Sequence, residues 1–429
     1  MQSISKNGTD GIGLQLAMFY LYLLSLPFLA LSVKTINGKD VLVSYLTTAL
    51  LLFYFFMRKD NARIFFPKEA KIFFVFLIFI LATIIYFLFF GVVDQKNISG
   101  AVTIALYLFF YVLLINIFVL QDKKTIFKYI DVFIIICFFV SLYSFLQAIL
   151  PVNSIVYKLF RNASNAYTIW DPTMHLGTHK GFINLNRITG LAAEPGLWAA
   201  FLSIPLCLLL PRIYYRFRTI DFYIFIGILF PFLLTAGRTG FLSLFLAIIS
   251  FPCFILTGNK RRICIVLAVI VITLSIFWGL FAEFRFGQNK DWSTIERANG
   301  MIIATKMFVA NPLFGVGIGK YRLEQDKYQF EGINVAAGKG EYPYSYYLSL
   351  AAETGIVGLA LWLFFLKSIG NKIYKKNVSI KINTEEKAVC FGLTLAFLSI
   401  VFGWINIGGI NSVYYFFIFA IISVLCKRN

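Results

Sequence analysis

Long apolar runs separated by short polar stretches dominate the pattern of this chain. A membrane helix needs about 20 apolar residues to cross the hydrocarbon, and twelve segments approach this length. They run over residues 11–33, 41–57, 71–93, 100–120, 128–150, 190–210, 220–236, 239–257, 263–282, 344–367, 387–403 and 410–426. The pattern predicts an all-α polytopic membrane protein with about twelve transmembrane helices, in which residues 1–429 form a single membrane domain.

Basic residues gather in every second loop between these segments. The basic loops are 58–71, 121–128, 211–221, the turn near 260, 367–387 and the C-terminal tail. The short loops between them carry fewer Lys and Arg residues. Because these residues mark the cytoplasmic side of a membrane protein, both termini are expected in the cytoplasm. Two long loops, 151–189 and 283–343, are then expected on the opposite side.

Composition supports this assignment and limits the partners. The chain is 59% hydrophobic and 14% charged, against about 25% charged residues in soluble domains. A net charge of +19 would indicate nucleic acid in a soluble protein, but here the basic residues lie in short loops, so no nucleic-acid partner is expected. The six cysteines show no paired spacing, which argues against a disulfide framework and a metal site. The first apolar run is long enough to span the membrane and does not resemble a signal peptide.

The long loop 283–343 carries signals of local structure. Ser293 and Glu296 form a capping-box pattern, which starts a helix, and this helix is expected to run to about Ala310. Asn311-Pro312 then ends it, and the following glycines, Gly315 to Gly319, are expected to form a flexible turn. The loop therefore contains short helices.

Four features with functional side chains fall on the predicted outer side. Arg187 and Glu194 stand where the sixth segment begins, and Arg238 lies in a glycine-containing turn between the seventh and eighth segments. Arg297 belongs to the predicted loop helix, and a tyrosine cluster precedes the tenth segment. The cluster members of interest are Tyr342, Tyr344 and Tyr346. Charged groups at the edge of a membrane segment are costly and often mark a functional path.

Each feature also has a structural explanation. Arg238 could cap a helix or bind lipid headgroups, and Glu194 followed by proline suits a helix start. The tyrosines suit the aromatic belt at the membrane surface. His175 and His179, with Asp171, have weak ligand spacing, so we expect neither a metal nor another cofactor. The arrangement favours function, since arginines and a carboxylate on one face suit an anionic, lipid-linked substrate.

The motifs together resemble one superfamily. They are Arg187-x-x-Gly190-x-x-x-Glu194-Pro195, Thr235-Ala-Gly-Arg238-Thr-Gly240, Asn311-Pro312-Leu-Phe-Gly315-Val-Gly317-Ile-Gly319, Tyr344-Ser345-x-x-Leu348 and Glu353-x-Gly355-x-x-Gly358-Leu359. In this order they look like the O-antigen polymerase (Wzy) and O-antigen ligase superfamily, over roughly residues 185–365. The resemblance implies a C-type glycosyltransferase fold. It also implies glycosyl transfer at the outer face of the bacterial inner membrane, without nucleotide sugars.

One difference from the motifs of this superfamily helps to choose between polymerase and ligase. Ligases usually show a histidine followed by Asn or Ser where this chain has Tyr344-Ser345. The resemblance therefore favours a polymerase, which joins undecaprenyl-diphosphate-linked repeat units for O-antigen or a related surface polysaccharide. A ligase that transfers the glycan to lipid A core stays an alternative. A polymerase implies a lipid-linked donor and acceptor, and a chain-length regulator as a further partner.

The residues suit such a reaction. The diphosphate leaving group develops negative charge, which arginines in a dry cavity stabilise, and a desolvated carboxylate can accept the proton of the acceptor hydroxyl. We therefore assign diphosphate binding to Arg187, Arg238 and Arg297, and the base role to Glu194. The three tyrosines would stack on sugars or orient the phosphate. A lipid-linked-sugar transporter would predict internal repeats and mid-membrane charges, and a scaffold would leave the arginines unexplained.

Overall fold

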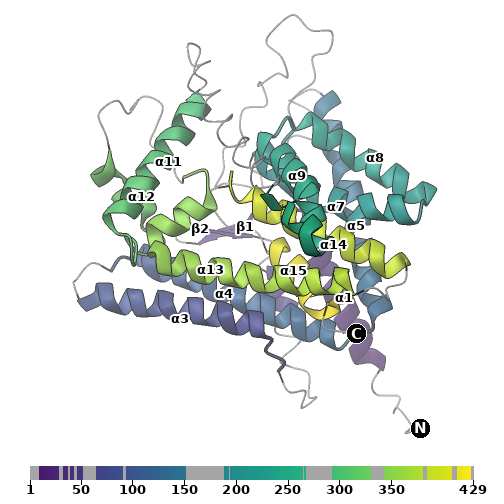
Figure 1. The fold of residues 1–429 in the computed structure, drawn as a ribbon, viewed down its shortest axis with the longest axis horizontal. Helices are drawn as coiled ribbons and strands as arrows, with labels where there is room; N and C mark the ends of the chain where they lie inside the picture. The colour runs from purple at the N-terminus through teal and green to yellow at the C-terminus, as the bar shows by residue number, and fades with distance from the viewer. Residues whose placement is uncertain are drawn as a thin grey trace, which may run out of the picture.

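The computed structural model shows a helical bundle (Figure 1). It describes residues 9–28, 32–36, 39–42, 46–51, 64–89, 93–150, 188–192, 194–263, 265–266, 292–329, 343–379, 384–407 and 413–426. The main helices are α1 (Thr9–Ser25), α3 (Lys68–Phe89), α4 (Gln95–Val119), α5 (Lys123–Ile149), α7 (Pro195–Tyr215), α8 (Thr219–Leu234), α9 (Arg238–Ser250), α11 (Trp292–Ala310), α13 (Tyr346–Val378), α14 (Thr384–Gly403) and α15 (Tyr414–Leu425). Short helical turns follow at η2 (Phe251–Phe254), α12 (Tyr321–Glu324) and η4 (Gln325–Tyr328).

Six helices within the described ranges are long and apolar enough to cross a membrane, which confirms a polytopic membrane protein. They are α3, α4, α5, α7, α13 and α14. Three shorter apolar helices, Thr219–Leu234, Arg238–Phe254 and Tyr414–Leu425, also coincide with predicted segments. The predicted segment 263–282 lies almost wholly outside the described residues. The number twelve therefore stays a prediction.

Local sequence explains where the helices begin and end. Asp94 starts α4 with a complete capping box: its side chain accepts from a backbone amide of the helix, and the Asn97 side chain accepts from the Asp94 amide. The Asp122 side chain caps α5 by accepting from the amide of Thr125. α1 ends at Ser25, earlier than the predicted segment 11–33, because Pro27 cannot continue a helix.

A small hairpin interrupts the otherwise helical chain. Strands β1 (Ser32–Ile36) and β2 (Lys39–Leu42) pair antiparallel. The apolar and basic pattern did not predict this hairpin, although the Asn-Gly pair between the strands is a strong two-residue hairpin signal.

The bundle has two packed groups that share one core. In one group α7 packs against α8, α9 and α14; in the other α3 packs against α4 and α13, and α15 against α4. Aromatic rings fill the second group, where Phe73 contacts both Trp362 and Phe416. In its most apolar stretch, α7 has 78% of its residues buried, whereas α3 has only 22%. α7 is therefore central in the bundle and α3 peripheral.

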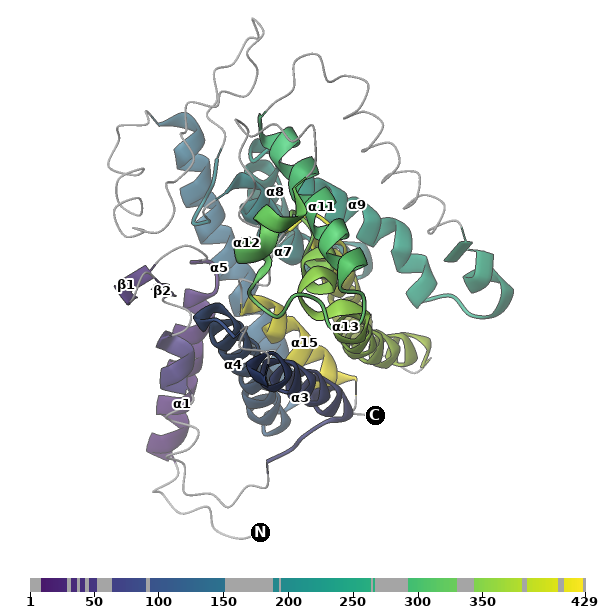
Figure 2. The ribbon, with the colours of Figure 1, turned by 90° about the vertical axis from the view of Figure 1, so that its left-hand side faces the viewer.

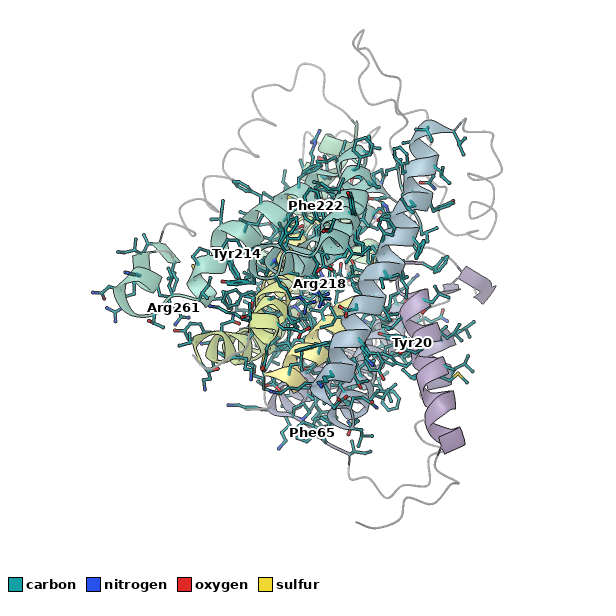
Figure 3. All side chains as sticks on the ribbon, turned by 90° about the vertical axis from the view of Figure 1, so that its right-hand side faces the viewer. Tyr20, Phe65, Tyr214, Arg218, Phe222 and Arg261 are labelled. Carbon is teal, nitrogen blue, oxygen red and sulfur yellow. The ribbon has the colours of Figure 1, made fainter. Side chains whose placement is uncertain are left out.

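The predicted basic loops meet at one end of the bundle, which we call the basic end. Three groups of ion pairs connect the helix ends there: Arg212 with Asp131, Arg216 with Glu385, and Lys123 and Lys376 with Glu386. The view in Figure 3 shows Tyr214, Arg218, Phe222 and Arg261 on this side of the molecule. Tyrosine and basic residues together are typical of a membrane–water interface.

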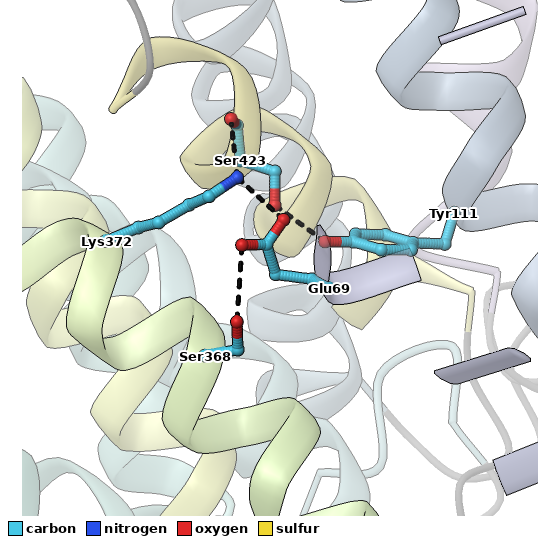
Figure 4. A network of polar contacts seen from close by, with 5 residues as sticks. All are labelled: Glu69, Tyr111, Ser368, Lys372 and Ser423. Carbon is cyan, nitrogen blue, oxygen red and sulfur yellow. Dashed lines mark hydrogen bonds and ion pairs between the residues drawn. The ribbon is translucent and has the colours of Figure 1, made fainter. Parts of the chain in front are cut away.

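A buried ion pair lies at the same end (Figure 4). Lys372 Nζ on α13 is 2.6 Å from Glu69 Oε2 on α3, and the Glu69 side chain is only 2% exposed. The Ser368 hydroxyl donates to Glu69 at 3.3 Å, and Lys372 also donates to the Ser423 carbonyl at 3.4 Å. The network thus ties α3, α13 and α15 together.

We expect Lys372→Met to lower the free energy of unfolding by about 3 kcal/mol, because it leaves a buried carboxylate without its counter-charge. The double variant Glu69→Gln with Lys372→Met should lie closer to the parent. Chemical unfolding in detergent measures both. Arg216→Met, which breaks a half-exposed pair, is the control and should cost less than about 1 kcal/mol. Equal losses for Arg216 and Lys372 would contradict the role of the network.

Candidate functional site

The end opposite the basic end gathers the segments that carry the candidate residues (Figure 2). The segment before α7 is fixed first. Gly190 exchanges two hydrogen bonds with Gln147 at the end of α5, at 2.9 and 3.1 Å. Gly190 adopts a left-handed φ of 59°, and a Cβ there would lie 2.1 Å from the Trp198 ring. A glycine is therefore required at this position of the motif.

Glu194 directly precedes α7, whose first residue is Pro195. Its backbone is extended, and its side chain makes no capping hydrogen bond to the helix. Proline at this position and an acid beside it fit a helix start, as the structural explanation predicts. The carboxylate is half-buried, at the positive end of the helix dipole. Arg187 lies outside the described residues.

The start of α9 packs closely on the start of α7. Cβ atoms at Gly237 and Gly240 would lie 2.7 and 2.4 Å from the Ala199 Cβ. These glycines therefore allow α7 and α9 to approach each other closely. Arg238 is the first residue of α9, and its side chain is exposed. The residue Ala236 just before it has a φ of 46°, a strained value for a residue with a Cβ.

The residues that follow α14 accept hydrogen bonds from both α9 and the start of α13. The Thr239 hydroxyl donates to the Asn406 carbonyl at 3.5 Å, and the Tyr346 amide donates to the Trp404 carbonyl at 2.9 Å. Tyr346 itself is buried, with ring centroids 5.6 Å from Trp362 and 5.5 Å from Trp404. This placement favours a packing role for Tyr346 over the predicted stacking on a sugar.

Arg297 of α11 lies over the ring of Tyr344, 4.8 Å from its centroid. The Arg297 Nε is buried and has no hydrogen-bond partner among the described residues. The same holds for the amide nitrogen of Asn299, two residues later. Because a buried donor without an acceptor is costly, these two groups suit an anionic or polar ligand. Tyr342, predicted to join them, lies outside the described residues.

Residues 311–320, which we call the glycine turn, connect α11 to α12. The predicted helix ending at Ala310 is confirmed. The turn after it was expected to be flexible, but its backbone is hydrogen-bonded to α13. The amides of Val316 and Gly317 donate to the carbonyls of Ala352 and Glu353 at 2.9 Å each. In return, Ile356 donates to the Pro312 carbonyl at 2.8 Å. The turn is thus hydrogen-bonded along α13.

Glu353 completes this attachment, and its role was missed from the sequence although it belongs to a quoted motif. Its carboxylate accepts from the Tyr321 amide at 3.0 Å and from the backbone of Gly319. The Tyr321 hydroxyl donates to the Gly300 carbonyl of α11 at 3.0 Å. Burial, and then the nearby Glu353 carboxylate, raises the pKa of Tyr321, so the hydroxyl stays protonated as a donor. The chain Glu353–Tyr321–Gly300 therefore fixes α11, which carries Arg297.

A family of known proteins also matches part of this chain. The family described as O-Antigen ligase matches residues 223–363. The matched stretch runs from α8 into α13 and includes Arg238, Arg297, the glycine turn and Tyr344. Over these residues the match confirms the resemblance to the superfamily of O-antigen polymerases and ligases. No curated protein matches the chain.

We expect Glu353→Ala to lower the free energy of unfolding by about 2 kcal/mol or more, since each buried donor left without an acceptor costs about 1–3 kcal/mol. Glu353→Gln should cost less, because its amide oxygen can still accept. Thermal unfolding in detergent compares them. The control is Glu324→Ala, which removes only a surface pair with Lys327 and should have an effect below about 1 kcal/mol. A Glu353→Ala variant as stable as the control would exclude the clamp.

Proposed function

We propose that this protein is a glycosyltransferase that polymerises undecaprenyl-diphosphate-linked oligosaccharide repeat units at the periplasmic face of the bacterial inner membrane. The observation that carries the proposal is the buried Arg297 Nε, which has no hydrogen-bond partner among the described residues. It lies at the end of the bundle where Glu194 precedes α7 and Arg238 begins α9. A carbohydrate–diphosphate substrate offers acceptor oxygens for such donors.

The two ends of the bundle give the proposed orientation. The basic end faces the cytoplasm if the positive-inside rule holds, which places both termini inside. The end with Arg238 and Arg297 then faces outward, where lipid-linked repeat units would be available. A multi-pass protein of this orientation would take its donor and acceptor from the surrounding membrane lipids. No nucleic acid takes part.

The reaction forms one bond and breaks one. An acceptor hydroxyl oxygen attacks the anomeric carbon of the donor glycan, and the bond from that carbon to the diphosphate oxygen breaks. The electron pair leaves with undecaprenyl diphosphate, whose negative charge Arg187, Arg238 and Arg297 would stabilise. Glu194 would accept the hydroxyl proton. Tyr344, held beneath Arg297, would orient the phosphate or stack on a sugar, and Tyr342 is proposed for the same role. In this scheme the arginines take the electrostatic role of a metal.

The choice of polymerase over ligase rests on Tyr344-Ser345, where ligases usually have a histidine, together with the motif Arg187-x-x-Gly190-x-x-x-Glu194-Pro195. A ligase acting on lipid A core is the second candidate, favoured by the description of the matching family. A polymerase would also work with a chain-length regulator. A strain without this protein distinguishes the two activities: loss of the ladder with a surviving single repeat unit indicates a polymerase, and loss of all attachment to core indicates a ligase.

The central experiment measures transfer of labelled glycan between lipid carriers by the purified protein in liposomes. Only an enzyme lengthens the glycan; a transporter would move it across the bilayer unchanged, and a scaffold would do neither. We expect Arg187→Ala and Arg238→Ala each to lower this transfer by roughly tenfold to a hundredfold, since a charge-assisted contact contributes about 1.5–3 kcal/mol. Arg→Lys should restore only part of it, because lysine lacks the planar fork.

The matched control for the arginines is Arg218→Ala. Arg218 is equally exposed and precedes α8, as Arg238 begins α9, but at the opposite end of the bundle. Its loss should leave transfer unchanged. Full transfer by both Arg187→Ala and Arg238→Ala would refute the diphosphate-binding role, and an equal loss in Arg218→Ala would show a general effect of charge.

A separate prediction concerns Glu194. If Glu194 is the base, Glu194→Gln should keep the fold and reduce the rate per folded molecule by about a hundredfold. The parent should lose activity as the pH falls and the carboxylate becomes protonated, and the Gln variant should lack this acid limb. The alternative is a carboxylate that only stabilises the start of α7. Then Gln would cost about 0.3–1 kcal/mol of stability with the rate nearly unchanged.

A further inference from the structure

An exposed apolar tip stands out in the predicted water-side loop 283–343. Val309 is 69% exposed, Leu313 57% and Phe314 43%, and the exposed Pro312 lies between them. We propose that the glycine turn reaches back into the outer half of the membrane, and that this apolar tip of Val309, Leu313 and Phe314 contacts the lipid acyl chains. The partner is the bilayer hydrocarbon.

The first measure of depth comes from α3. This helix has 22 residues, about 33 Å at a rise of 1.5 Å per residue, which matches the hydrocarbon thickness of about 30 Å. The Phe314 ring centroid lies 6.3 Å from that of Phe79 and 6.0 Å from that of Tyr86. Phe79 is close to the middle of α3, and Tyr86 is near its outer end at Phe89. Phe314 therefore lies beside the outer half of a membrane-length helix.

The second measure comes from α13, independently of α3. Gly355 interrupts this helix with a non-helical φ of 66° and ψ of −168°, well inside the span that begins at Tyr346. The glycine turn fits against this break. A Cβ at Gly355 would lie 2.2 Å from the Leu313 carbonyl oxygen and 2.6 Å from the Phe314 nitrogen. Gly355 is about 13 Å from the start of α13 along its axis, so both helices place the turn below the membrane surface.

The backbone hydrogen bonds of the glycine turn meet the requirement for a position inside the membrane. Non-helical backbone at membrane depth is tolerated only where the protein itself supplies the hydrogen-bond partners. Here α13 provides them to Val316, Gly317, Gly319 and Tyr321, through two carbonyls and the Glu353 carboxylate. On the other side, the Asn97 amide of α4 donates to the Ile318 carbonyl at 3.0 Å. A turn in water would not need a buried carboxylate as acceptor.

The outer half of α3, which Phe314 contacts, also exposes apolar side chains. Ile85, Leu88 and Phe89 are 56%, 64% and 85% exposed, as expected for residues that face lipid on a helix buried over only 22% of its apolar window. Polar side chains return one turn before Val309, where Thr305 and Lys306 are exposed. This change from polar to apolar along α11 marks where the helix enters the hydrocarbon.

The experiment places a tryptophan in the tip of the full-length protein in vesicles. Leu313→Trp is compared with Leu323→Trp, a leucine of similar exposure, 46%, on α12, beside the charged residues Asp326 and Lys327. Fluorescence beyond that of the parent is recorded in brominated-acyl-chain phosphatidylcholine and with aqueous iodide. We expect bromine to quench the tryptophan at 313 at least twofold more than that at 323, and iodide to show the reverse.

Other outcomes would overturn the proposal. Stronger quenching of the 313 tryptophan by iodide than by bromine would place the tip in water. Little quenching by either, together with association of the protein in the vesicles, would assign the tip to a contact with a second copy. If Leu313→Trp does not fold, Val309→Trp tests the same surface. Since neither quencher depends on catalysis, the result is independent of the proposed function.

Discussion

Hydrogen-bonding groups of the backbone that lie away from water must find their partners inside the protein, and this constraint shapes the region around α13. The break at Gly355 releases α13 carbonyls, and the glycine turn uses them. Glu353 provides the remaining acceptor for Gly319 and Tyr321. Arg297 depends on this arrangement, since α11 is held to α13 through Tyr321 and the Gly300 carbonyl. One buried carboxylate thus connects the backbone of a turn with the position of a guanidinium group.

Charged side chains are paired with one another at the basic end of the bundle, and two arginines differ from this at the other end. At the basic end, carboxylates such as Glu69 and Glu386 neutralise lysines that lie on neighbouring helices. At the other end, Arg238 is exposed and the Arg297 Nε has no acceptor among the described residues. Paired charges stabilise the association of helices, whereas a cation without a protein acceptor can bind a ligand. The contrast between the ends is therefore the physical basis for placing the candidate site.

The apolar pattern was sufficient to predict a polytopic helical membrane protein, because long apolar segments have few other structures available. A capping-box pattern and the Asn311-Pro312 stop predicted the helix that ends at Ala310. The glycine turn was expected to be flexible, but its amides are hydrogen-bonded to α13. The sequence did not reveal these partners because they lie more than 30 residues away. For the same reason the sequence did not separate Tyr346, buried against tryptophans, from Tyr344, which faces Arg297. Side-chain chemistry indicated which residues could act, and long-range contacts determine which of them are packed in the core.

The attachment of the glycine turn also limits how this part of the chain could change in length. Its first residues contact the break in α13, its middle accepts from Asn97 of α4, and its end donates to Glu353. An inserted residue would shift every later amide away from its acceptor. A deletion would make the turn too short to form all three contacts at once. The ten residues from Asn311 to Lys320 therefore behave as a spacer of fixed length between α11 and α12.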